Sequence, residues 1–472
     1  AQHTVGMNGK FIEGTHESLD DRYVKDCDSD IIDILDANNR LYREHIYTHD
    51  YPHCWRTDHP LLYYAMDSWF VRMTAVKDKI IQFNSEVEWA PEWTGTGRVG
   101  EWLRNIKDWA ISRERYWGTP IPVWICQDCG HEHCIGSIEE MESLKTSDSS
   151  SPKELHRPYV DDVKLDCTSD NCNGIMIREP YVMDCWFDSG CASFAQWHYP
   201  FENEDKFKGS FPVDYICEAV DQTRGWFYSL LAVSTTVFDS ICYHRCLSLG
   251  HILDSEGKKM SKSKGNVVNP WDHFNKEGTD AIRWYMTTQS APWNPMNFDP
   301  KGVRETYAKM FLTLWNVHRF HADYAVLDNF DPDDKSTFVP VEKRSPLDRW
   351  ILSRISTVAQ DYHNQFVSWE FHKACRDLEN FVINDLSNWY VRRSRRRLWD
   401  EADSNDKRAC QHTLHEVLCT VSKLMAPISP FMPDRIHHDL TGESVHMADW
   451  PLGSSLVEKS LPPQDLELEQ KM

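Results

Sequence analysis

The chain has no apolar run near the roughly 18 residues that a membrane-spanning helix requires, so the sequence predicts no membrane partner. Its first residues are polar and form no apolar signal-peptide core, which predicts a cytoplasmic protein. Cysteine is also scarce, because 15 cysteines in 472 residues are too few for a disulfide scaffold. Since cytosolic thiols stay reduced, clustered cysteines are expected to be metal ligands or core residues.

Positive charge is in short supply as well. The 51 Lys and Arg residues oppose 73 Asp and Glu residues, which gives a net charge of −22. This balance argues against a protein that is basic all over, so a nucleic-acid partner would have to bind a local basic patch. The hydrophobic fraction of 41% is ordinary for a globular protein, and the length predicts about three domains.

The most specific string in the sequence is KMSKS, Lys259–Ser263, inside the Gly-flanked segment Asp254–Asn266. Two lysines, Lys259 and Lys262, on a small mobile loop can close over a triphosphate. There they would stabilise the negative charge of departing pyrophosphate. The alternative is a solvated basic loop, which the flanking glycines disfavour.

Strand-like and helix-like segments alternate before this loop. The residue pattern predicts a strand at Tyr215–Cys217, a helix at Thr223–Phe238 and a second strand at Cys246–Leu253. This alternation predicts a βαβ unit in a parallel sheet. Nearer the N-terminus, Leu61–Met66 and Trp69–Val71 also resemble strands.

From about residue 302 to 440 the pattern changes to amphipathic helices, which predicts an α-helical bundle. Four sets of apolar residues repeat at helical spacing. They are Tyr307, Met310, Phe311, Leu314 and Trp315; Leu347, Trp350, Ile351, Ile355 and Val358; Leu378, Phe381, Val382, Leu386, Trp389 and Tyr390; and Leu414, Val417, Leu418, Val421, Leu424 and Met425.

Carboxylates follow the first strand of the predicted βαβ unit. Glu218 and Asp221 lie where parallel sheets bind ligands, so they could hold an ammonium group and ribose hydroxyls. Gln222 could add hydrogen bonds. The alternative is that Asp221 caps the next helix.

Large aromatic residues lie near these carboxylates. Trp186, in a predicted turn Trp186–Gly190, and Trp226 could form the walls of an apolar pocket. Buried tryptophan is more often a core residue, which is the alternative for both.

Two cysteine pairs predict a structural zinc knuckle. The four candidate ligands are Cys126, Cys129, Cys167 and Cys172. Because the second pair has four intervening residues, four unconnected cysteines remain an alternative. His131, His133 and Cys134 lie nearby and could replace one ligand.

Five arginines gather between Trp389 and Trp399 and end a predicted helix. They are Arg392, Arg393, Arg395, Arg396 and Arg397. Arginine interleaved with aromatic residues suits RNA phosphates and unstacked bases. The alternative is a favourable interaction with the helix dipole.

The order and the residue sequences of these motifs resemble those of class I aminoacyl-tRNA synthetases. In detail they resemble isoleucyl-tRNA synthetase of the archaeal and eukaryotic type. The resemblance covers about residues 50 to 452. The segments that carry it, besides KMSKS, are Ile111–Trp124, Asp184–Gly190, Asp221–Phe227, Leu386–Arg397 and Ser444–Pro451. It implies a fold of α/β plus all-α class: the second half of a Rossmann catalytic core with a zinc-knuckle insertion, then an anticodon-binding helix bundle.

The resemblance also implies roles for single residues. Glu218, with Asp221 and Gln222, would bind the aminoacyl-adenylate, and Trp186 and Trp226 would line the isoleucine pocket. Lys259 and Lys262 would hold ATP phosphates, with Lys262 the stronger candidate in the transition state. The implied substrates are ATP with Mg²⁺, isoleucine and tRNA(Ile), the implied metal is a structural Zn²⁺, and the protein would be a monomer.

The sequence departs from the family in several places. No HxGH string, the family's first ATP-binding motif, occurs in it, and Ala219 stands where the family usually has glycine. We therefore expect an internal fragment that is inactive alone. The alternatives are a non-catalytic tRNA-binding module or a valyl or leucyl relative.

The resemblance divides the chain into six regions. They are an editing-domain remnant (1–75), a return into the core (76–125), the zinc knuckle (126–180), the half-core with KMSKS (181–301), the anticodon-binding bundle (302–452) and the start of a truncated C-terminal region (453–472).

Overall fold

The computed structural model describes residues 3–54, 57–114, 117–262, 265–401, 404–452 and 464–472. By its internal contacts the chain divides into two units, Ala1–Trp69 and Phe70–Met472. Among the described residues, no helix combines the length and the apolar character that crossing a membrane would take.

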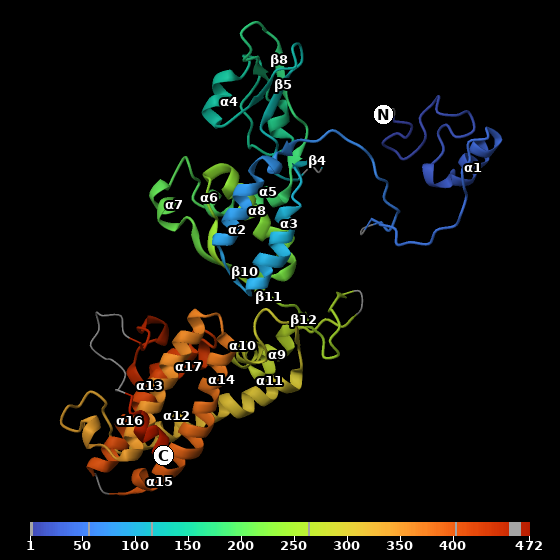
Figure 1. Cartoon of the computed structure of the whole chain (residues 1–472). Helices are drawn as coiled ribbons and strands as arrows, with labels where there is room; N and C mark the ends of the chain where they lie inside the picture. The colour runs from blue at the N-terminus through green and yellow to red at the C-terminus, as the bar shows by residue number, and fades with distance from the viewer. Residues whose placement is uncertain (1–2, 55–56, 115–116, 263–264, 402–403, 453–463) are drawn as a thin grey trace. The chain divides into compact units, whose positions relative to one another are not determined.

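The first unit has little regular structure (Figure 1). Its α-helix is α1 (Asp28–Ala37), and a small core forms around Phe11, Leu19 and Cys27. The predicted strand at Leu61–Met66 is wrong, because these residues pair with no neighbouring strand and Tyr63 is 92% exposed. Apolar residues without a partner strand do not make a ladder, whatever their β propensity.

The second unit contains a three-stranded parallel sheet. Its strands, in spatial order, are β10 (Val213–Ala219), β11 (Tyr243–Leu249) and β2 (Glu88–Ala90). Helix α8 (Trp226–Phe238) connects β10 to β11, so the predicted βαβ unit is confirmed. The helix begins later than predicted because a 3-10 turn, Val220–Arg224, comes first.

Helices and short strand pairs surround this sheet. The helical segments are η2 (Met73–Val76), α2 (Lys77–Glu86), the π-helix η3 (Thr94–Val99), α3 (Gly100–Arg104), α5 (Cys185–Gly190), α6 (Ala192–Ala195) and α7 (Glu204–Ser210). The paired strands are β1 (Phe70–Val71) with β3 (Trp109–Ala110), and β4 (Ser112–Arg113) with β9 (Val182–Met183).

The predicted turn at Trp186–Gly190 is instead the helix α5. The side chain of Asp184 caps it by accepting a hydrogen bond from the backbone N–H of Trp186 at 3.0 Å. At its other end α5 packs closely on α8, since a Cβ at Gly190 would lie 2.7 Å from the carbonyl oxygen of Ser229. This contact fixes the position of Trp186 relative to the first turns of α8.

A separate four-stranded antiparallel sheet carries the cysteine pairs. Its order is β6 (Glu132–Cys134), β5 (Val123–Cys126), β8 (Ile175–Arg178) and β7 (Leu165–Asp166), with α4 (Ile138–Leu144) beside it. Its own core surrounds Trp124, Leu165 and Met176.

The lysine loop leaves the sheet region through β12 (Ile252–Leu253), which pairs in parallel with β13 (Met296–Asn297). Helices α9 (Pro270–Glu277) and α10 (Thr279–Thr288) lie between these strands in sequence.

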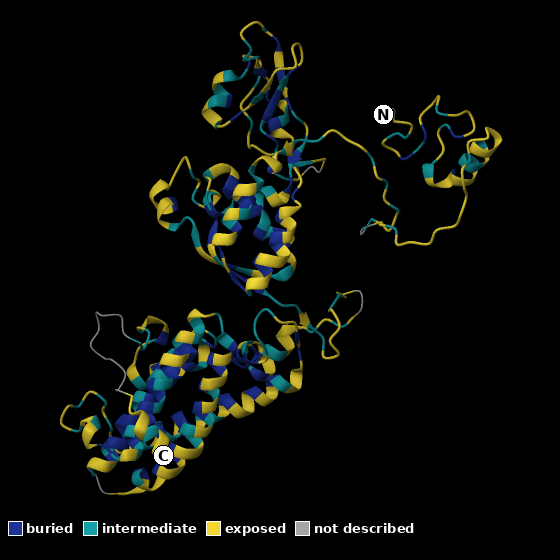
Figure 2. Cartoon of the chain, in the orientation of Figure 1, coloured by how far each residue is buried: buried dark blue, intermediate teal, exposed yellow. Residues whose placement is uncertain are grey.

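The predicted helical bundle is confirmed, and its buried residues follow the inner helix faces (Figure 2). All four predicted apolar sets lie on its helices. These are α11 (Pro300–Thr306), the π-helix η7 (Tyr307–Phe311), α12 (Leu312–Leu327), α13 (Pro346–Val367), α14 (Phe371–Asn380), the π-helix η9 (Phe381–Val391), α15 (Arg392–Trp399), α16 (Asn405–Met425) and α17 (Phe431–Thr441). Beyond them, α18 (Leu466–Lys471) is held against α13 by Glu469, whose carboxylate accepts a hydrogen bond from Thr357 at 2.9 Å.

Candidate functional site

The four predicted zinc ligands converge, with the sulfur atoms of Cys126, Cys129, Cys167 and Cys172 all within 4.8 Å of one another. The Sγ atoms of Cys126 and Cys172 are 3.6 Å apart, and those of Cys129 and Cys167 are 3.7 Å apart. A tetrahedral zinc ion with Zn–S bonds of about 2.3 Å holds its sulfurs about 3.8 Å apart, so these residues fit one zinc ion. The alternative of four unconnected cysteines is wrong.

Backbone N–H groups that donate to the thiols favour the thiolate form, but hydrogen bonds with the neighbouring thiols and burial raise the pKa of Cys167 and raise that of Cys172 to about 12. The N–H of Gly174 donates to Sγ of Cys172 at 3.3 Å, and that of Ser169 donates to Sγ of Cys167 at 3.5 Å. Backbone hydrogen bonds, chiefly from Cys129, lower the pKa of Cys126 to about 7. Glycine is needed at position 174, because a Cβ there would lie 2.8 Å from Sγ of Cys126.

The substitute ligands considered from the sequence lie outside this cluster. Nε2 of His131 is 3.1 Å from the hydroxyl of Thr168, and Nε2 of His133 is 3.0 Å from the carboxylate of Glu140. Cys134 is exposed and takes no part in the thiol group. The ligand set is therefore Cys₄, as expected for a structural site without an open position.

The predicted carboxylates lie at the C-terminal end of β10 and in the turn after it. Glu218 and Asp221 are exposed, and Oδ1 of Asp221 is 3.9 Å from Nε2 of His251, just before β12. The side-chain oxygen of Gln222 accepts the N–H of Trp226 at 3.0 Å. Gln222, rather than Asp221, therefore caps α8, which leaves both carboxylates accessible to a ligand.

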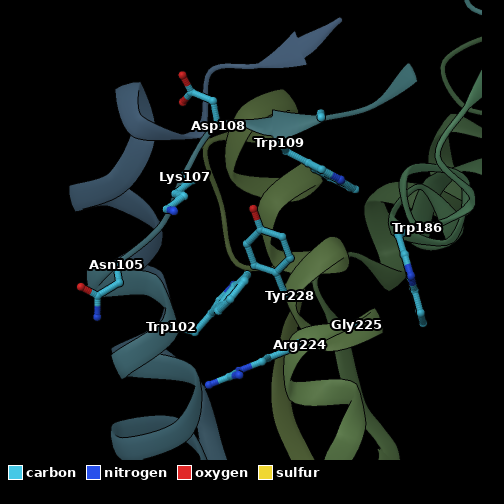
Figure 3. A pocket seen from close by; sticks show the side chains of 10 residues that line it. Trp102, Asn105, Lys107, Asp108, Trp109, Trp186, Arg224, Gly225 and Tyr228 are labelled. Carbon is cyan, nitrogen blue, oxygen red and sulfur yellow. The ribbon is translucent and has the colours of Figure 1, made fainter. Parts of the chain in front are cut away.

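A pocket of about 380 Å³ opens beside α3, α5 and the start of α8 (Figure 3). Trp186, 39% exposed, lies in its wall. Trp226 does not line it. The indole N–H of Trp226 donates to the carbonyl of Ser189 at 3.1 Å, and its ring packs on the apolar core beside the sheet. Trp226 is partly buried, and its place in the wall of the amino-acid pocket stays a prediction.

The lysine loop is a hairpin whose end is closed by an antiparallel bridge between Leu253 and Lys259. Gly257 has a φ of +79°, a left-handed conformation that suits glycine. Lys258 pairs with Glu256 at 2.7 Å. Lys259 and Lys262 are exposed and form no ion pair with any described residue, so both charges are available to a phosphate; Ser263 lies outside the described residues.

The arginine cluster of α15 divides into two kinds of side chain. Arg392, Arg393, Arg395 and Arg396 are exposed, and the guanidinium of Arg393 lies 4.6 Å from the ring centre of Trp389. Arg397 differs, because it donates to Asp348 at 2.8 Å and to Asp406 at 2.8 Å. Its guanidinium holds the bundle together, so of the five predicted arginines it is the one not open to RNA.

Sequence reasoning missed several residues around these sites. Trp102, Trp109, Arg224 and Tyr228 share the pocket wall with Trp186, although they come from two other segments of the chain. Their sequence signal was only their aromatic or basic character. The hydrogen bonding of the lysine loop by Asn266 was also missed, although asparagine after glycine is a frequent turn former.

Comparison with known proteins agrees with this geometry. Residues 12–299 match the family of tRNA synthetases class I (I, L, M and V), and residues 348–472 match the anticodon-binding domain of tRNA ligases. The chain therefore belongs to the class I tRNA synthetases, which confirms the predicted fold class and the predicted enzyme family.

Similarity to curated relatives indicates which class I tRNA synthetases the chain resembles in sequence. An isoleucine–tRNA ligase of Clostridium acetobutylicum is 47% identical over 97% of this chain, and one of Clostridium novyi is 47% identical over 99%. An isoleucine–tRNA ligase 2 of Bacillus anthracis is 45% identical over 99%. The chain spans 44% of the length of each of these relatives.

Solved structures support the fold alone. A LeuRS from Agrobacterium radiobacter, in a ternary complex with tRNA and LeuAMS, superposes with a TM-score of 0.57 at 19% identity over 77% of this chain and 43% of its own. A methionyl-tRNA synthetase of Mycobacterium tuberculosis gives 0.56 at 17% identity over 82% and 65%.

Proposed function

We propose that this chain belongs to an isoleucine–tRNA ligase, which activates isoleucine with ATP and then transfers it to tRNA(Ile). The observation that carries the proposal is the contact of Asp221 with His251 at 3.9 Å. It places the start of the lysine loop beside the carboxylate turn after β10. A triphosphate held by the lysines would thus lie near groups that can hold the ribose and the amino acid.

In the first step, a carboxylate oxygen of isoleucine attacks the α-phosphorus of ATP, and pyrophosphate leaves with its Mg²⁺. Lys259 and Lys262 stabilise the charge on the leaving group, while Glu218, Asp221 and Gln222 bind the adenylate. In the second step, a terminal ribose hydroxyl of tRNA attacks the carbonyl carbon, the bond to AMP breaks, and the hydroxyl proton passes to the departing phosphate. No side-chain nucleophile is required, because positioning and charge stabilisation suffice.

We assign the remaining predicted residues to supporting roles. Trp186 and Trp226 line the isoleucine pocket, and Trp226 also supports α5 through its hydrogen bond to Ser189. The Cys₄ cluster holds a structural Zn²⁺. Exposed arginines of the bundle bind tRNA phosphates; they are Arg392, Arg393, Arg395 and Arg396.

We further propose the six domain boundaries given above, the archaeal and eukaryotic type, and a monomer. A cytoplasmic location agrees with 15 free cysteines, since thiols persist in a reducing compartment. Because the chain spans 44% of its curated relatives, we expect no catalysis from it alone.

Binding of isoleucyl-sulfamoyl adenosine, a stable adenylate analogue, tests the proposal by calorimetry. We expect binding that is lost in Glu218→Gln and kept in the matched control Glu204→Gln on α7. Tighter binding of the valyl or leucyl analogue would favour those relatives instead, and no binding of any analogue would favour a tRNA-binding module. ATP–pyrophosphate exchange with isoleucine by this chain alone would contradict the expected inactivity.

A further inference from the structure

Trp369, in the loop between α13 and α14, adopts a backbone conformation that rarely suits its side chain. Its φ of +62° is left-handed, at the position after a helix end where glycine is most frequent. Its backbone N–H still donates to the carbonyl of Phe366 at 3.1 Å. A bulky residue persists in such a conformation only when its surroundings hold it there, so the contacts of the ring are informative.

The ring of Trp369 contacts one residue on each of the three parallel strands. Its indole N–H donates to Oε1 of Glu88 on β2 at 3.0 Å. Its ring centre lies 5.8 Å from that of Tyr215 on β10 and 5.5 Å from the guanidinium of Arg245 on β11. In the sheet register Tyr215 pairs with Arg245 and Arg245 pairs with Glu88, so the three residues form one row across the sheet. Trp369 thus contacts the full width of this sheet.

Two of these strands lead to the residues that we assign to the adenylate and to the lysine loop. On β10, Glu218 comes three residues after Tyr215, a distance of about 10 Å along an extended strand. On β11, Arg245 is followed by Leu249 at the strand end, and then by His251. Because β10 and β11 are joined by a regular parallel ladder, a displacement of the row would also move Glu218.

On its other side Trp369 precedes a long helical stretch of the bundle. The segments α14, η9 and α15 follow one another without a break from Phe371 to Trp399. At about 1.5 Å per residue this stretch spans roughly 40 Å, and the exposed arginines assigned to tRNA lie in its last part, α15. The ring of Phe371, its first residue, is centred 5.9 Å from that of Trp369. A helix therefore connects the proposed tRNA surface with the side chain that contacts the sheet.

We propose that Trp369 is a positioning residue, which couples RNA binding at the bundle to the affinity of the adenylate site at Glu218; this inference rests on the proposed function. Trp369 contacts no substrate and acts through Tyr215 and Arg245. A shift of the helix on RNA binding moves the ring, the row of three residues and the end of β10. If position 369 served only to end α13, glycine would fit the backbone better. Because transfer needs both ligands bound, the coupling is expected to be favourable.

The test measures the affinity of the 472-residue chain for isoleucyl-sulfamoyl adenosine by calorimetry, with and without a saturating RNA hairpin. The hairpin has the sequence of the anticodon stem and loop of tRNA(Ile), so it lacks the acceptor end. We expect the hairpin to tighten analogue binding about 5-fold or more, within the usual range for coupled sites. In Trp369→Gly this factor should fall below about 2, while each ligand alone should bind within about 2-fold of the unaltered chain.

The variants separate the ring from the backbone. Trp369→Gly removes the ring but suits the left-handed conformation, so the loop should keep its shape. Asn329→Gly is the matched control and should keep the coupling, because exposed Asn329 also has a left-handed φ, +51°, after the end of α12. Trp369→Phe keeps a ring for Tyr215 and Arg245 but loses the hydrogen bond to Glu88, so its coupling factor should be intermediate. Circular dichroism verifies the fold of each variant.

A spectroscopic measurement follows Trp369 directly. In a chain labelled with 5-fluorotryptophan, the ¹⁹F resonance that is missing in Trp369→Phe belongs to Trp369. We expect this resonance to shift when the hairpin binds and again when the analogue binds. The resonance of Trp271, which is 68% exposed on α9, should not shift with the hairpin. A side chain that only stabilised the fold would give no such response.

Loss of the coupling in Trp369→Gly, with both separate affinities retained, supports the inference. Equal coupling in Trp369→Gly and the unaltered chain, no coupling in the unaltered chain, or a Trp369 resonance that shifts with neither ligand overturns it, while analogue binding in the same samples upholds the proposed function. Absence of analogue binding by the unaltered chain refutes the proposed function and the inference with it. If Trp369→Gly does not fold, Trp369→Phe and the resonance decide.

Discussion

Asn266 at the end of the lysine loop is hydrogen-bonded to Asp254 at its start: the side-chain N–H group of Asn266 donates to Oδ2 of Asp254 at 2.8 Å. The same amide accepts the N–H of Ser261 at 2.9 Å and donates to the carbonyl of Lys259 at 3.2 Å. Oδ1 of Asp254 accepts the N–H of Lys258 at 2.8 Å. The Asn266 hydrogen bond is the main cause that lowers the pKa of Asp254, so the carboxylate stays ionised. The loop is therefore shaped from within while its two key lysines stay free.

Asn266→Ala should loosen this loop without unfolding the protein. The variant loses three hydrogen bonds worth about 1 kcal/mol each, so amide hydrogen exchange in 254–262 should accelerate on the order of 100-fold. Mass spectrometry of peptides measures it. Ser255→Ala, an exposed change in the same loop, should have no effect. Unchanged exchange in Asn266→Ala would show that the loop does not depend on this amide.

Zinc binding should depend on the four clustered cysteines and not on the total number of cysteines in the chain. We expect one zinc ion per chain by atomic absorption, and loss of that zinc in Cys129→Ser. Cys134→Ser, an equally exposed cysteine on the same sheet, should keep it. In small metal domains the free energy of metal binding contributes directly to folding. Removal of zinc by a chelator should therefore also make residues 126–180 more susceptible to cleavage by a protease. Equal zinc content in both variants would refute the Cys₄ assignment.

The exposed arginines of α15 should contribute charge to tRNA binding. Arg395→Gln with Arg396→Gln should weaken binding of tRNA(Ile) and lower the slope of log affinity against log salt by up to about 1.8, at 0.9 per phosphate contact. Filter binding at several salt concentrations measures both. Binding and slope equal to those of the unaltered chain would remove these side chains from the contact surface.

Arg397 should behave differently from its neighbours. Asp348 is fully buried, and it accepts from Arg397 at 2.8 Å and from the hydroxyl of Tyr390 at 2.5 Å. Arg397→Gln leaves that buried charge without its cation, which costs about 3 kcal/mol or more. Urea unfolding should show this loss, whereas Arg396→Gln should change stability by less than about 0.5 kcal/mol. Similar stability of the two variants would contradict the structural role of Arg397.

The structural features that depend on residues close together in the sequence were predicted correctly. The helical stripes of the bundle and the strand before Glu218 were correct, because periodic burial follows from secondary structure itself. The cysteine spacing predicted a shared metal site, since two residues between thiols bring both to one ion. These features need no knowledge of distant partners.

The failures involve partners far apart in sequence. Arg397 looked like its neighbours because Asp348, 49 residues away, cannot be recognised as its partner from the sequence. Leu61–Met66 has strand composition but no strand beside it. Trp102 and Trp109 had no motif to mark them, since only folding brings them to Trp186.

A group of buried histidines in the bundle sets its response to acid. His321 is 2% exposed and is surrounded by His318, His412 and His415, with Phe330 5.8 Å from its ring centre. Burial, reinforced by His415 and the other histidines, lowers the pKa of His321 to about 3. Burial likewise lowers the pKa of His415 to about 4. Both rings are therefore neutral in the folded protein.

Stability should fall as the solution becomes acidic. Above about pH 6.5 both rings are neutral whether the protein is folded or not, so their contribution is complete. Below that pH the unfolded chain binds protons that the folded chain excludes, and each histidine costs roughly 1 kcal/mol per pH unit until its folded pKa is reached. His321→Gln should make the fall between pH 6 and 4 less steep, while His438→Gln, an exposed change on α17, should not. Urea unfolding followed by circular dichroism at pH 7.5, 6 and 5 measures the slope. The same steepness in His321→Gln and the unaltered chain would show that His321 is not protonated on unfolding in this range.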